Sequence, residues 1–284
     1  MIEPRMLSLL PIMLFFFSAT ACQPTAPKLK KTEKMEFDTT GHGQIITTYL
    51  KQGAWNHHYV TKEWHEWIDK GLEQDSTIAL LWQQKALPYW KTRKYDLAIE
   101  YYGKAVYYNR EKYLSRRGFL ICVFAKRYRL ALEDIRAYHS EYGETYENDH
   151  SLRFYEGLCY LGLNQYEDAF ETFHKEISMQ EKEHGQQWVP YLERFYLAIS
   201  YYELGQYENA VKQFDLVLEE YTNFSDAKFW KGKCLIYLGQ IEEGKELQRE
   251  GYENHKAGYT FNEGSSPYEA YPYQITWEWP YLVK

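Results

Sequence analysis

The densest group of titratable side chains lies near residue 60, among three tryptophans. It contains the residue types that bind metal ions or transfer protons: His57, His58, Glu63, His65 and Glu66. His65 and Glu66 begin the pattern of a helical zinc site, but no second histidine stands four residues after His65. The sequence therefore predicts no metal site here, only the polar rim of a helix packed by Trp55, Trp64 and Trp67.

The other sequence patterns that accompany catalysis or cofactor binding are also missing. The chain has no Gly-rich phosphate loop and no serine in a nucleophile-elbow motif. Glu219 and Glu220 are neighbours in sequence, and neighbours on a helix point apart, so they do not form a carboxylate pair. We therefore expect a protein that is not an enzyme and holds no cofactor.

Three cysteines, Cys122, Cys159 and Cys234, lie in apolar stretches with helical spacing. Because their number is odd, they cannot all pair within one chain. None has the close Cys/His spacing of a zinc site. A free cysteine in such a stretch behaves as a small buried hydrophobic residue, which is the interpretation we adopt.

Cys22 is the residue for which the sequence predicts a chemical modification. It follows a short positive start, an apolar run and three small residues, which is the layout of a secretory signal peptide. A cysteine at this place resembles the bacterial lipobox, although Ala19 replaces the commoner leucine and Glu3 weakens the positive start. The resemblance implies a signal peptide at residues 1–21 and several acyl chains on Cys22, which together anchor stably. Ordinary secretion and an uncleaved anchor are the alternatives.

Composition separates a tether from the globular part of the chain. Residues 22–44 are rich in Pro, Thr and Lys, which predicts a flexible tether with a reach of roughly 25 Å. The whole chain of 284 residues carries a formal net charge of −7 and no basic stripe. That charge argues against nucleic acid as a partner.

A repeated pattern predicts the elements that position the remaining side chains. A tyrosine, two mostly polar residues and an alanine recur at Tyr95–Ala98, Tyr128–Ala131, Tyr166–Ala169 and Tyr207–Ala210. A large apolar residue follows four positions after each alanine, and a small residue lies upstream of each copy. This spacing predicts pairs of closely packed helices, with glycine ending the first helix in several copies at Leu-Gly sequences.

The pattern resembles the tetratricopeptide repeat, which has a period of about 34 residues. Copies begin near residues 79, 112, 150, 191 and 225, and a degenerate copy at 45–78 has Trp64, Ile68 and Gly71 in packing positions. The resemblance implies an all-α solenoid of about five to six helix pairs over residues 45–258. One turn, near Ala125, is a residue longer, and insertions occur at residues 148–149 and 184–190.

Solenoids of this family bind partners on a concave groove lined by the first helix of each pair. The fifth and sixth positions of each repeat belong to this lining, and their residues run from polar through basic to aromatic: Gln83-Gln84, Arg116-Arg117, Phe154-Tyr155, Phe195-Tyr196 and Phe229-Trp230. We expect the three phenylalanines in the core between helices. The candidate groove residues are Tyr155, Tyr196, Tyr202, Trp230 and Tyr237, since aromatic side chains are good anchors for a partner.

Arg116 and Arg117 have two interpretations. Either arginine could bind a carboxylate of a partner. The simpler expectation is a salt bridge from each arginine to an acidic residue on a neighbouring helix. The Lys, Asn and Arg pattern of the family's peptide-carboxylate clamp is absent.

The C-terminal segment, residues 259–284, contains eight aromatic residues and three prolines. The prolines exclude a continuous helix, so we expect a largely irregular segment. So many aromatic rings do not stay exposed on a monomer. The simpler interpretation is a cap over the last helix pair, and the alternative is a built-in ligand that threads into the groove.

Together these features predict a lipid-anchored scaffold or adaptor of the bacterial cell envelope, at the outer membrane, that holds a protein or peptide segment in its groove. The alternative is a surface or periplasmic protein that captures a glycan or another non-protein ligand on the aromatic groove. Exposed flat rings beside polar side chains would favour a glycan. Pockets between rings with a rim of mixed charge would favour a protein.

Overall fold

A computed structural model of the protein describes residues 39–276. The predicted signal peptide, Cys22, most of the predicted tether and the last eight residues of the C-terminal segment lie outside this range. Within it the structure contains twelve α-helices and one two-stranded hairpin. The all-α fold class predicted from the sequence is therefore confirmed.

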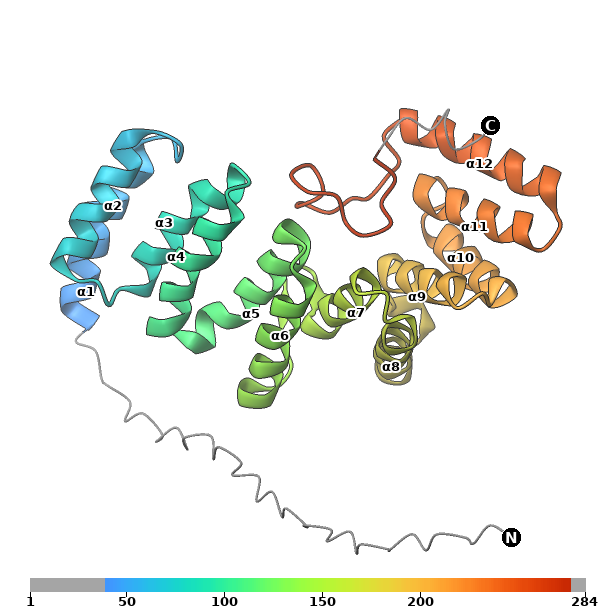
Figure 1. Ribbon diagram of the computed structural model, residues 1–284, viewed down its shortest axis with the longest axis horizontal. Coiled ribbons are helices and arrows are strands. Elements are labelled where there is room, and N and C mark those ends of the chain that lie inside the picture. Colours follow the sequence, from blue (N-terminus) through green and yellow to red (C-terminus); the bar gives the residue numbers. More distant parts are fainter. Residues whose placement is uncertain (1–38, 277–284) are drawn as a thin grey trace, which may run out of the picture. The chain divides into compact units, whose positions relative to one another are not determined.

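The helices follow one another along the chain with short connections (Figure 1). Their bounds are α1 (Thr39–Ile46), α2 (Lys62–Gln74), α3 (Ala79–Lys91), α4 (Tyr95–Tyr108), α5 (Arg110–Leu120), α6 (Tyr128–Tyr142), α7 (Leu152–Gly162), α8 (Tyr166–His184), α9 (Tyr191–Glu203), α10 (Tyr207–Glu220), α11 (Ser225–Tyr237) and α12 (Ile241–Lys256). Each odd-numbered helix from α3 onward packs on the even-numbered helix after it, which gives five consecutive pairs. The helix α1, its continuation η1 (Thr47–Lys51), the short turn η2 (Ala54–Asn56) and α2 precede these pairs, and α1 begins inside the segment predicted as a tether.

Small residues at the predicted contacts let the two helices of a pair approach closely. The alanines of the four repeated motifs are completely buried: Ala98, Ala131, Ala169 and Ala210. In α7, a Cβ atom on Gly157 would lie 2.5 Å from the ring of Phe173 on α8. Trp64, Ile68 and Gly71 of the degenerate copy are also buried, as the sequence predicts.

The turns between paired helices use a left-handed residue. Gly205 and Gly239 have φ angles of 72° and 84°, a conformation that glycine adopts without strain. At residues 161–164, which read Leu-Gly-Leu-Asn, the glycine is not the left-handed residue. Our prediction that glycine ends the first helix was wrong for this copy. The left-handed residue is Asn164, while Gly162 stays helical and packs against Tyr128, whose ring leaves no room for a Cβ atom.

The irregular places in the repeat also take definite forms. The extra residue near Ala125 is accommodated by a π-helical turn, η3 (Ile121–Ala125), which ends at the left-handed Lys126. The insertion at residues 148–149 is the turn of a hairpin made by β1 (Tyr146–Glu147) and β2 (His150–Ser151). The insertion at residues 184–190 contains a 3-10 turn, η4 (Gln186–Trp188).

The C-terminal segment contains neither helix nor strand over residues 259–276, as the sequence predicts. In Figure 1 it leaves α12, extends toward α5 and turns back toward α11. Phe261, Tyr271 and Ile275 from this segment are all buried against the repeat. The segment is therefore part of the packed structure.

Candidate partner-binding surface

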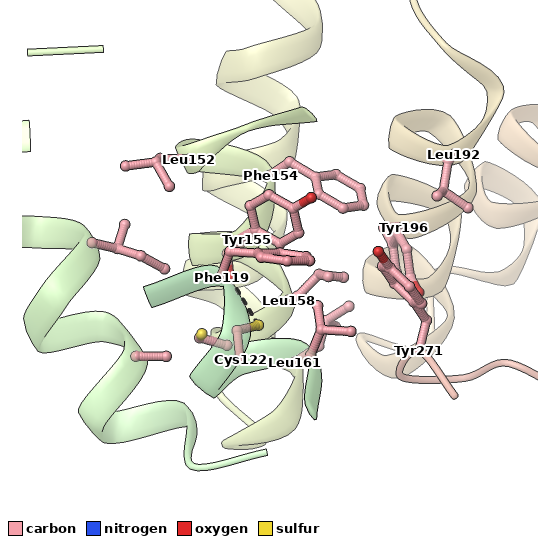
Figure 2. Close-up of a cluster of buried hydrophobic side chains, with 14 of the residues drawn as sticks. Phe119, Cys122, Leu152, Phe154, Tyr155, Leu158, Leu161, Leu192, Tyr196 and Tyr271 are labelled. Atoms are coloured by element: carbon pink, nitrogen blue, oxygen red, sulfur yellow. Dashed lines mark hydrogen bonds between the residues drawn. The ribbon is translucent and has the colours of Figure 1, made fainter. Parts of the chain in front are cut away.

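The first helices of the pairs, α3, α5, α7, α9 and α11, form what we call the inner face. In its C-terminal half, Tyr196 on α9 is completely buried. Its hydroxyl donates a hydrogen bond to the carbonyl of Pro272, at 2.8 Å. Tyr271 of the C-terminal segment lies beside Tyr196 (Figure 2). The aromatic residue predicted to bind a partner is thus bound by the protein's own chain.

The next aromatic candidate along the inner face, Trp230 on α11, has the same kind of partner. Its indole Nε1 donates to the carbonyl of Tyr273 at 2.9 Å, and the two rings meet edge to face with centroids 5.3 Å apart. The hydroxyl of Tyr273 donates to Glu203 at 2.7 Å. Tyr273 is therefore held from α9 and α11 together.

Asp226, at the start of α11, anchors both ends of the described C-terminal segment. Its carboxylate accepts hydrogen bonds from the backbone N–H of Ile275 at 2.6 Å and from the hydroxyl of Thr260 at 2.8 Å. It also accepts one from Ser225 at 2.9 Å. Burial raises the pKa of Asp226, and these hydrogen bonds oppose that rise. We did not predict this residue, because its partners lie 34 and 49 positions away in sequence.

His150 on β2 forms a second buried polar link to the C-terminal segment. Its Nδ1 lies 2.9 Å from Glu193 on α9, and its Nε2 lies 3.3 Å from Glu263. Burial lowers the pKa of His150, but the hydrogen bonds and charges of the two glutamates outweigh burial and raise it to about 10. The imidazole is therefore cationic at neutral pH and joins three elements.

The outermost part of the C-terminal segment reaches the N-terminal half of the inner face. Glu269 pairs with Arg93 at 3.0 Å and with Lys126 at 3.4 Å, and it accepts a hydrogen bond from Tyr95. The ammonium of Lys91 lies 3.4 Å above the ring of Tyr268. These contacts are more exposed than those of Asp226 and His150, with the Arg93 side chain 69% exposed.

These contacts distinguish the two interpretations of the C-terminal segment. It packs on the last pair, where Ile275 contacts Phe229, but it also runs over α9 and α7 to the turn after α3. The segment therefore covers the last pair, as the interpretation as a cap expects, and also extends beyond it. Beyond the last pair it lies along the inner face as a built-in ligand would, with hydrogen bonds to Tyr196 on α9 and to Arg93 after α3.

The remaining candidate residues have different surroundings. Tyr155 is completely buried: its hydroxyl bonds to the carbonyl of Glu147 and its ring packs edge to face on Phe119, so it is not the open groove residue that we expected. Tyr202 is partly buried next to Trp230. Tyr237 is 57% exposed and stacks on Tyr207. The core positions predicted for Phe154, Phe195 and Phe229 are confirmed by their burial.

Both arginines form salt bridges within the protein, but only Arg117 forms the expected one to an acidic residue on a neighbouring helix. Arg117 holds Asp134 on α6 through two hydrogen bonds of 2.6 and 2.7 Å. Arg116 contacts Glu147 at 3.1 Å and Asn148 at 2.9 Å, both on the hairpin. Arg116 thus fixes the hairpin beside α5, a contact that the sequence did not predict.

An open cavity of about 580 Å³ remains in the N-terminal half of the inner face. Its apolar walls come from Leu87, Trp90, Phe119, Leu120 and Phe124. Its polar lining residues carry both signs of charge: Gln83, Lys91, Arg116, Asn148, Asp149 and Glu263. We call it the inner-face cavity, and one of its walls is the C-terminal segment itself, through residues 263–265 and Tyr268.

The histidine cluster near residue 60 packs with aromatic rings. His58 stacks on Tyr59 with centroids 4.4 Å apart, and His65 lies against Tyr89 at 5.7 Å. Burial lowers the pKa of His65, which favours its neutral form. Over residues 39–276 no group of His, Cys, Asp or Glu side chains has the arrangement of a metal site. Cys122, Cys159 and Cys234 are buried free thiols, as predicted.

Comparison with known proteins agrees with this arrangement of helices. Residues 79–112 and 194–223 each match a tetratricopeptide repeat family model. The repeated pattern, the helix pairs and the two matched segments together define a tetratricopeptide repeat protein. None of the curated proteins matches the chain by sequence.

Solved structures of several bacterial proteins share the fold. A tetratricopeptide repeat protein from Parabacteroides merdae is 16% identical with a TM-score of 0.59, and the alignment covers 77% of this chain and 80% of that one. PilW, described as a type IV pilus biogenesis factor, is 15% identical with a TM-score of 0.55, over 76% and 93% of the two chains. MamA from Desulfovibrio magneticus is 12% identical with a TM-score of 0.52, over 63% and 96%. At these identities the likeness concerns the fold alone.

None of the helices between residues 39 and 276 combines the length and the apolar character that crossing a bilayer requires.

Proposed function

We propose that the protein is a non-catalytic, membrane-anchored adaptor that holds a peptide segment of a partner protein in the inner-face cavity. The observation that carries the proposal is the lining of this cavity, which combines apolar side chains with polar groups of both charges. Apolar pockets with a few placed polar groups fix the side chains of a bound segment and its orientation.

The same observation weighs against a glycan as the ligand. Sugar rings stack on exposed aromatic faces, and the two central rings of the predicted groove, Tyr155 and Tyr196, have no exposed surface. In the inner-face cavity, Trp90 and Phe119 are 4% and 1% exposed, and the ammonium of Lys91 already lies over the ring of the exposed Tyr268. A peptide side chain fits such a lining better than a sugar does.

The membrane anchor in this proposal rests on the sequence around Cys22. A signal peptide that ends in small residues before a cysteine supports export, lipidation and a place in the bacterial cell envelope, at the outer membrane. A lipid with two or more acyl chains anchors a protein stably. The predicted tether would let the repeat domain reach a partner close to the membrane.

Site-specific photo-crosslinking tests the partner. A photoreactive amino acid in place of Gln83, which lines the inner-face cavity, should crosslink one extended segment of an envelope protein. The same substitution at Gln206, an exposed residue in the turn before α10, is the matched control. Leu87→Glu should abolish the crosslink from position 83 by placing a charge on the apolar wall. Crosslinks to carbohydrate alone, or equal crosslinks from both positions, would refute the proposal.

A separate experiment tests the anchor. Cys22→Ala should move the protein from the membrane fraction to a soluble or unprocessed form. Cys234→Ala, a change at a buried free thiol, controls for the general effect of losing a cysteine. If the Cys22 variant still fractionates with membranes, the lipid anchor is wrong while the adaptor function stays testable by crosslinking.

A further inference from the structure

The two insertions in the repeat lie on either side of a second cavity. Asp149 is the one lining residue that this cavity shares with the inner-face cavity. The hairpin and the residues before it contribute one side, and the end of α8 with the following insertion contributes the other. The cavity measures about 370 Å³, and we call it the insertion cavity. Its lining residues are Glu144, Tyr146, Asp149, Ser151, Glu176, Met179, Gln180, Glu183, His184, Trp188, Pro190 and Glu193.

Three large apolar side chains in the insertion cavity are exposed. Trp188 is 69% exposed, Tyr146 64% and Met179 48%. Trp188 comes from the insertion at residues 184–190, Tyr146 from strand β1 of the hairpin, and Met179 from the last turns of α8. Exposed aromatic residues gathered at one cavity are typical of a binding surface, whereas single exposed ones are ordinary.

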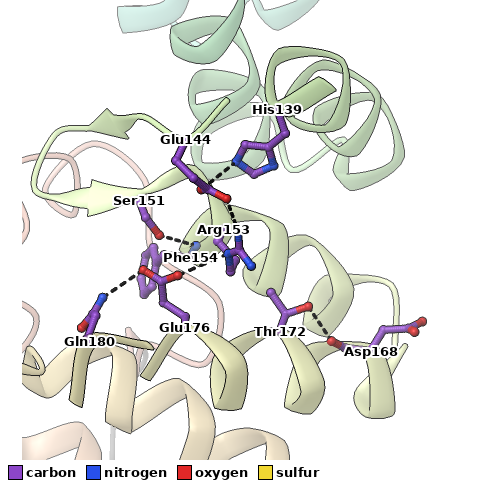
Figure 3. A network of polar contacts seen from close by, with 9 residues as sticks. All are labelled: His139, Glu144, Ser151, Arg153, Phe154, Asp168, Thr172, Glu176 and Gln180. Atoms are coloured by element: carbon purple, nitrogen blue, oxygen red, sulfur yellow. Dashed lines mark hydrogen bonds and ion pairs between the residues drawn. The ribbon is translucent and has the colours of Figure 1, made fainter. Parts of the chain in front are cut away.

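Carboxylates dominate the polar lining of the insertion cavity. Five of its lining residues are acidic, and His184 is the one potentially cationic residue among them. Arg153, which lies outside the lining, bonds Glu144 and lies 3.3 Å from Glu176, and His139 lies 3.4 Å from Glu144 (Figure 3). Across residues 39–276, the Asp149 side chain has no hydrogen bond or ion pair, and Glu183 has only His184 at 3.8 Å. Negative charge therefore remains in excess.

Glu193 is the acceptor that most directly indicates a missing ligand. Its side chain is 3% exposed and lines the insertion cavity. One oxygen, Oε1, bonds His150, but the buried Oε2 has no hydrogen-bond partner within the described part of the chain. A buried carboxylate oxygen without a donor is costly, so a donor entering the cavity would relieve that cost.

The electrostatic effect of these carboxylates is visible at Tyr146. Partial burial of the phenol raises the pKa of Tyr146, and the charges of Glu176, Glu144, Glu183 and Glu193 raise it further. A negative charge is therefore disfavoured in this cavity and a positive charge is favoured.

We propose that the insertion cavity binds an arginine side chain on a flexible segment of a partner protein. A guanidinium stacks on aromatic faces and donates to several carboxylates at once, which matches Trp188 and Tyr146 beside Glu183, Asp149 and the free oxygen of Glu193. A lysine ammonium has neither the planar shape nor the forked donors. Met179 provides an apolar contact for the residues that flank the arginine. This surface is a second contact for a partner and does not depend on the inner-face cavity being occupied.

A labelled peptide measures the proposed binding. Fluorescein-labelled Gly-Ser-Leu-Arg-Leu-Ser-Gly should bind the full chain, as measured by fluorescence polarisation, and its affinity should fall as the salt concentration rises. The same peptide with citrulline, which keeps the shape of arginine but not the charge, should bind at least about fivefold more weakly. The lysine peptide should fall between the two.

Exposed residues provide the matching variants of the protein. Trp188→Ala and Glu183→Gln should each weaken the arginine peptide by about threefold to tenfold. Tyr107→Ala removes an even more exposed ring on α4, and Glu171→Gln removes an exposed carboxylate on α8 outside the cavity lining, so both should leave the affinity unchanged. Equal thermal unfolding of all four variants would show that each is folded.

The outcomes separate the proposal from its alternatives. Equal binding of the citrulline and arginine peptides would overturn it, and so would unchanged affinity in both Trp188→Ala and Glu183→Gln. Loss of binding in Leu87→Glu with none in Trp188→Ala would assign the peptide to the inner-face cavity instead.

Discussion

The two halves of the inner face use the same helix positions for different purposes. In the C-terminal half the fifth and sixth positions carry Phe and Tyr or Trp, and the protein's own C-terminal segment covers them. In the N-terminal half they carry Gln83-Gln84 and Arg116-Arg117, and the inner-face cavity stays open. A partner-binding surface therefore cannot be inferred from aromatic content alone, since the most aromatic part of a repeat is also the part that most needs covering.

Removing the C-terminal segment should have the largest effect. A chain that ends at Gly258 loses the buried side chains of Phe261, Tyr271 and Ile275. At about 1.5–3 kcal/mol for each fully buried large side chain, the free energy of unfolding should fall by roughly 4 kcal/mol or more. Urea unfolding measures the fall. A chain that ends at Thr276 keeps the described contacts and is the matched control.

Hydrogen exchange on the two truncated chains would then test whether the two halves of the inner face depend differently on the C-terminal segment. In the chain that ends at Gly258, amides in α9 and α11 should lose protection while those in α3 and α4 keep theirs. Equal loss in both halves would mean that the segment stabilises the whole solenoid and that the halves do not differ.

His150 should give the next largest effect, and one that depends on pH. Because its folded-state pKa of about 10 lies above the ordinary value of 6.5, its stabilisation is complete below about pH 6.5 and is lost as the pH rises toward 10. His150→Gln should lower the free energy of unfolding at pH 6.5 by roughly 3 kcal/mol, as expected when one member of a buried ion pair is removed.

The measurement for His150 is the difference in urea midpoint between the natural chain and the variant at pH 6.5 and 9.5. The difference should shrink at the higher pH, because the unfolded chain is neutral at this histidine there and the folded chain has to keep a proton that the solvent no longer readily supplies. His184→Gln, a change at an exposed histidine, controls for titration in general. A difference that stays constant with pH would show that His150 acts only through packing.

The sequence predicted the fold well because the repeat is a local signal. Small residues such as Ala98 and Gly157 contact residues within the same helix pair, so their spacing alone identifies the pairs. The path of the C-terminal segment was less predictable. Its hydrogen bonds join residues as far apart as Arg93 and Tyr268, a separation of 175 positions, and no local pattern records such a contact.

The candidate site was predicted only in part, for a related physical reason. Tyr196 and Trp230 do lie on the predicted surface, but the sequence could not show that Pro272 and Tyr273 would occupy it. Asp226 and His150 were missed, because a buried charge is recognisable only when its partners are known. The insertions at residues 148–149 and 184–190 were located correctly, yet their meeting at one cavity depends on the stacking of the pairs.

Replacing Trp230 should cost less free energy than replacing His150. The effect can be measured as a loss of affinity between the repeat and its C-terminal segment. A synthetic peptide of residues 259–276 should bind the chain that ends at Gly258, if that chain remains folded. Trp230→Ala should weaken this binding by more than about 1 kcal/mol, since it removes a central ring and the hydrogen bond to Tyr273. Tyr237 also lies on α11, but its ring stacks on Tyr207, so Tyr237→Ala should change the affinity of the peptide little. Equal effects of the two changes would contradict the placement of the segment.

Glu269 should give the smallest effect, because it holds the segment where the two halves meet and where water reaches the contacts. Arg93 and Lys126, its two cationic partners, are 69% and 39% exposed, and pairs of this kind contribute from nothing to about 1 kcal/mol. Glu269→Gln removes the charge but keeps an acceptor for the hydroxyl of Tyr95. Urea unfolding should therefore show a loss below about 1 kcal/mol, while amides near residue 268 exchange faster. Asp96→Asn, at another exposed pair on α4, provides the scale for an ordinary surface contact. If Glu269→Gln destabilised the chain as much as truncation does, the outermost contacts and not the buried rings would hold the segment. The difference between the covered C-terminal half and the open N-terminal half of the inner face would then have another cause.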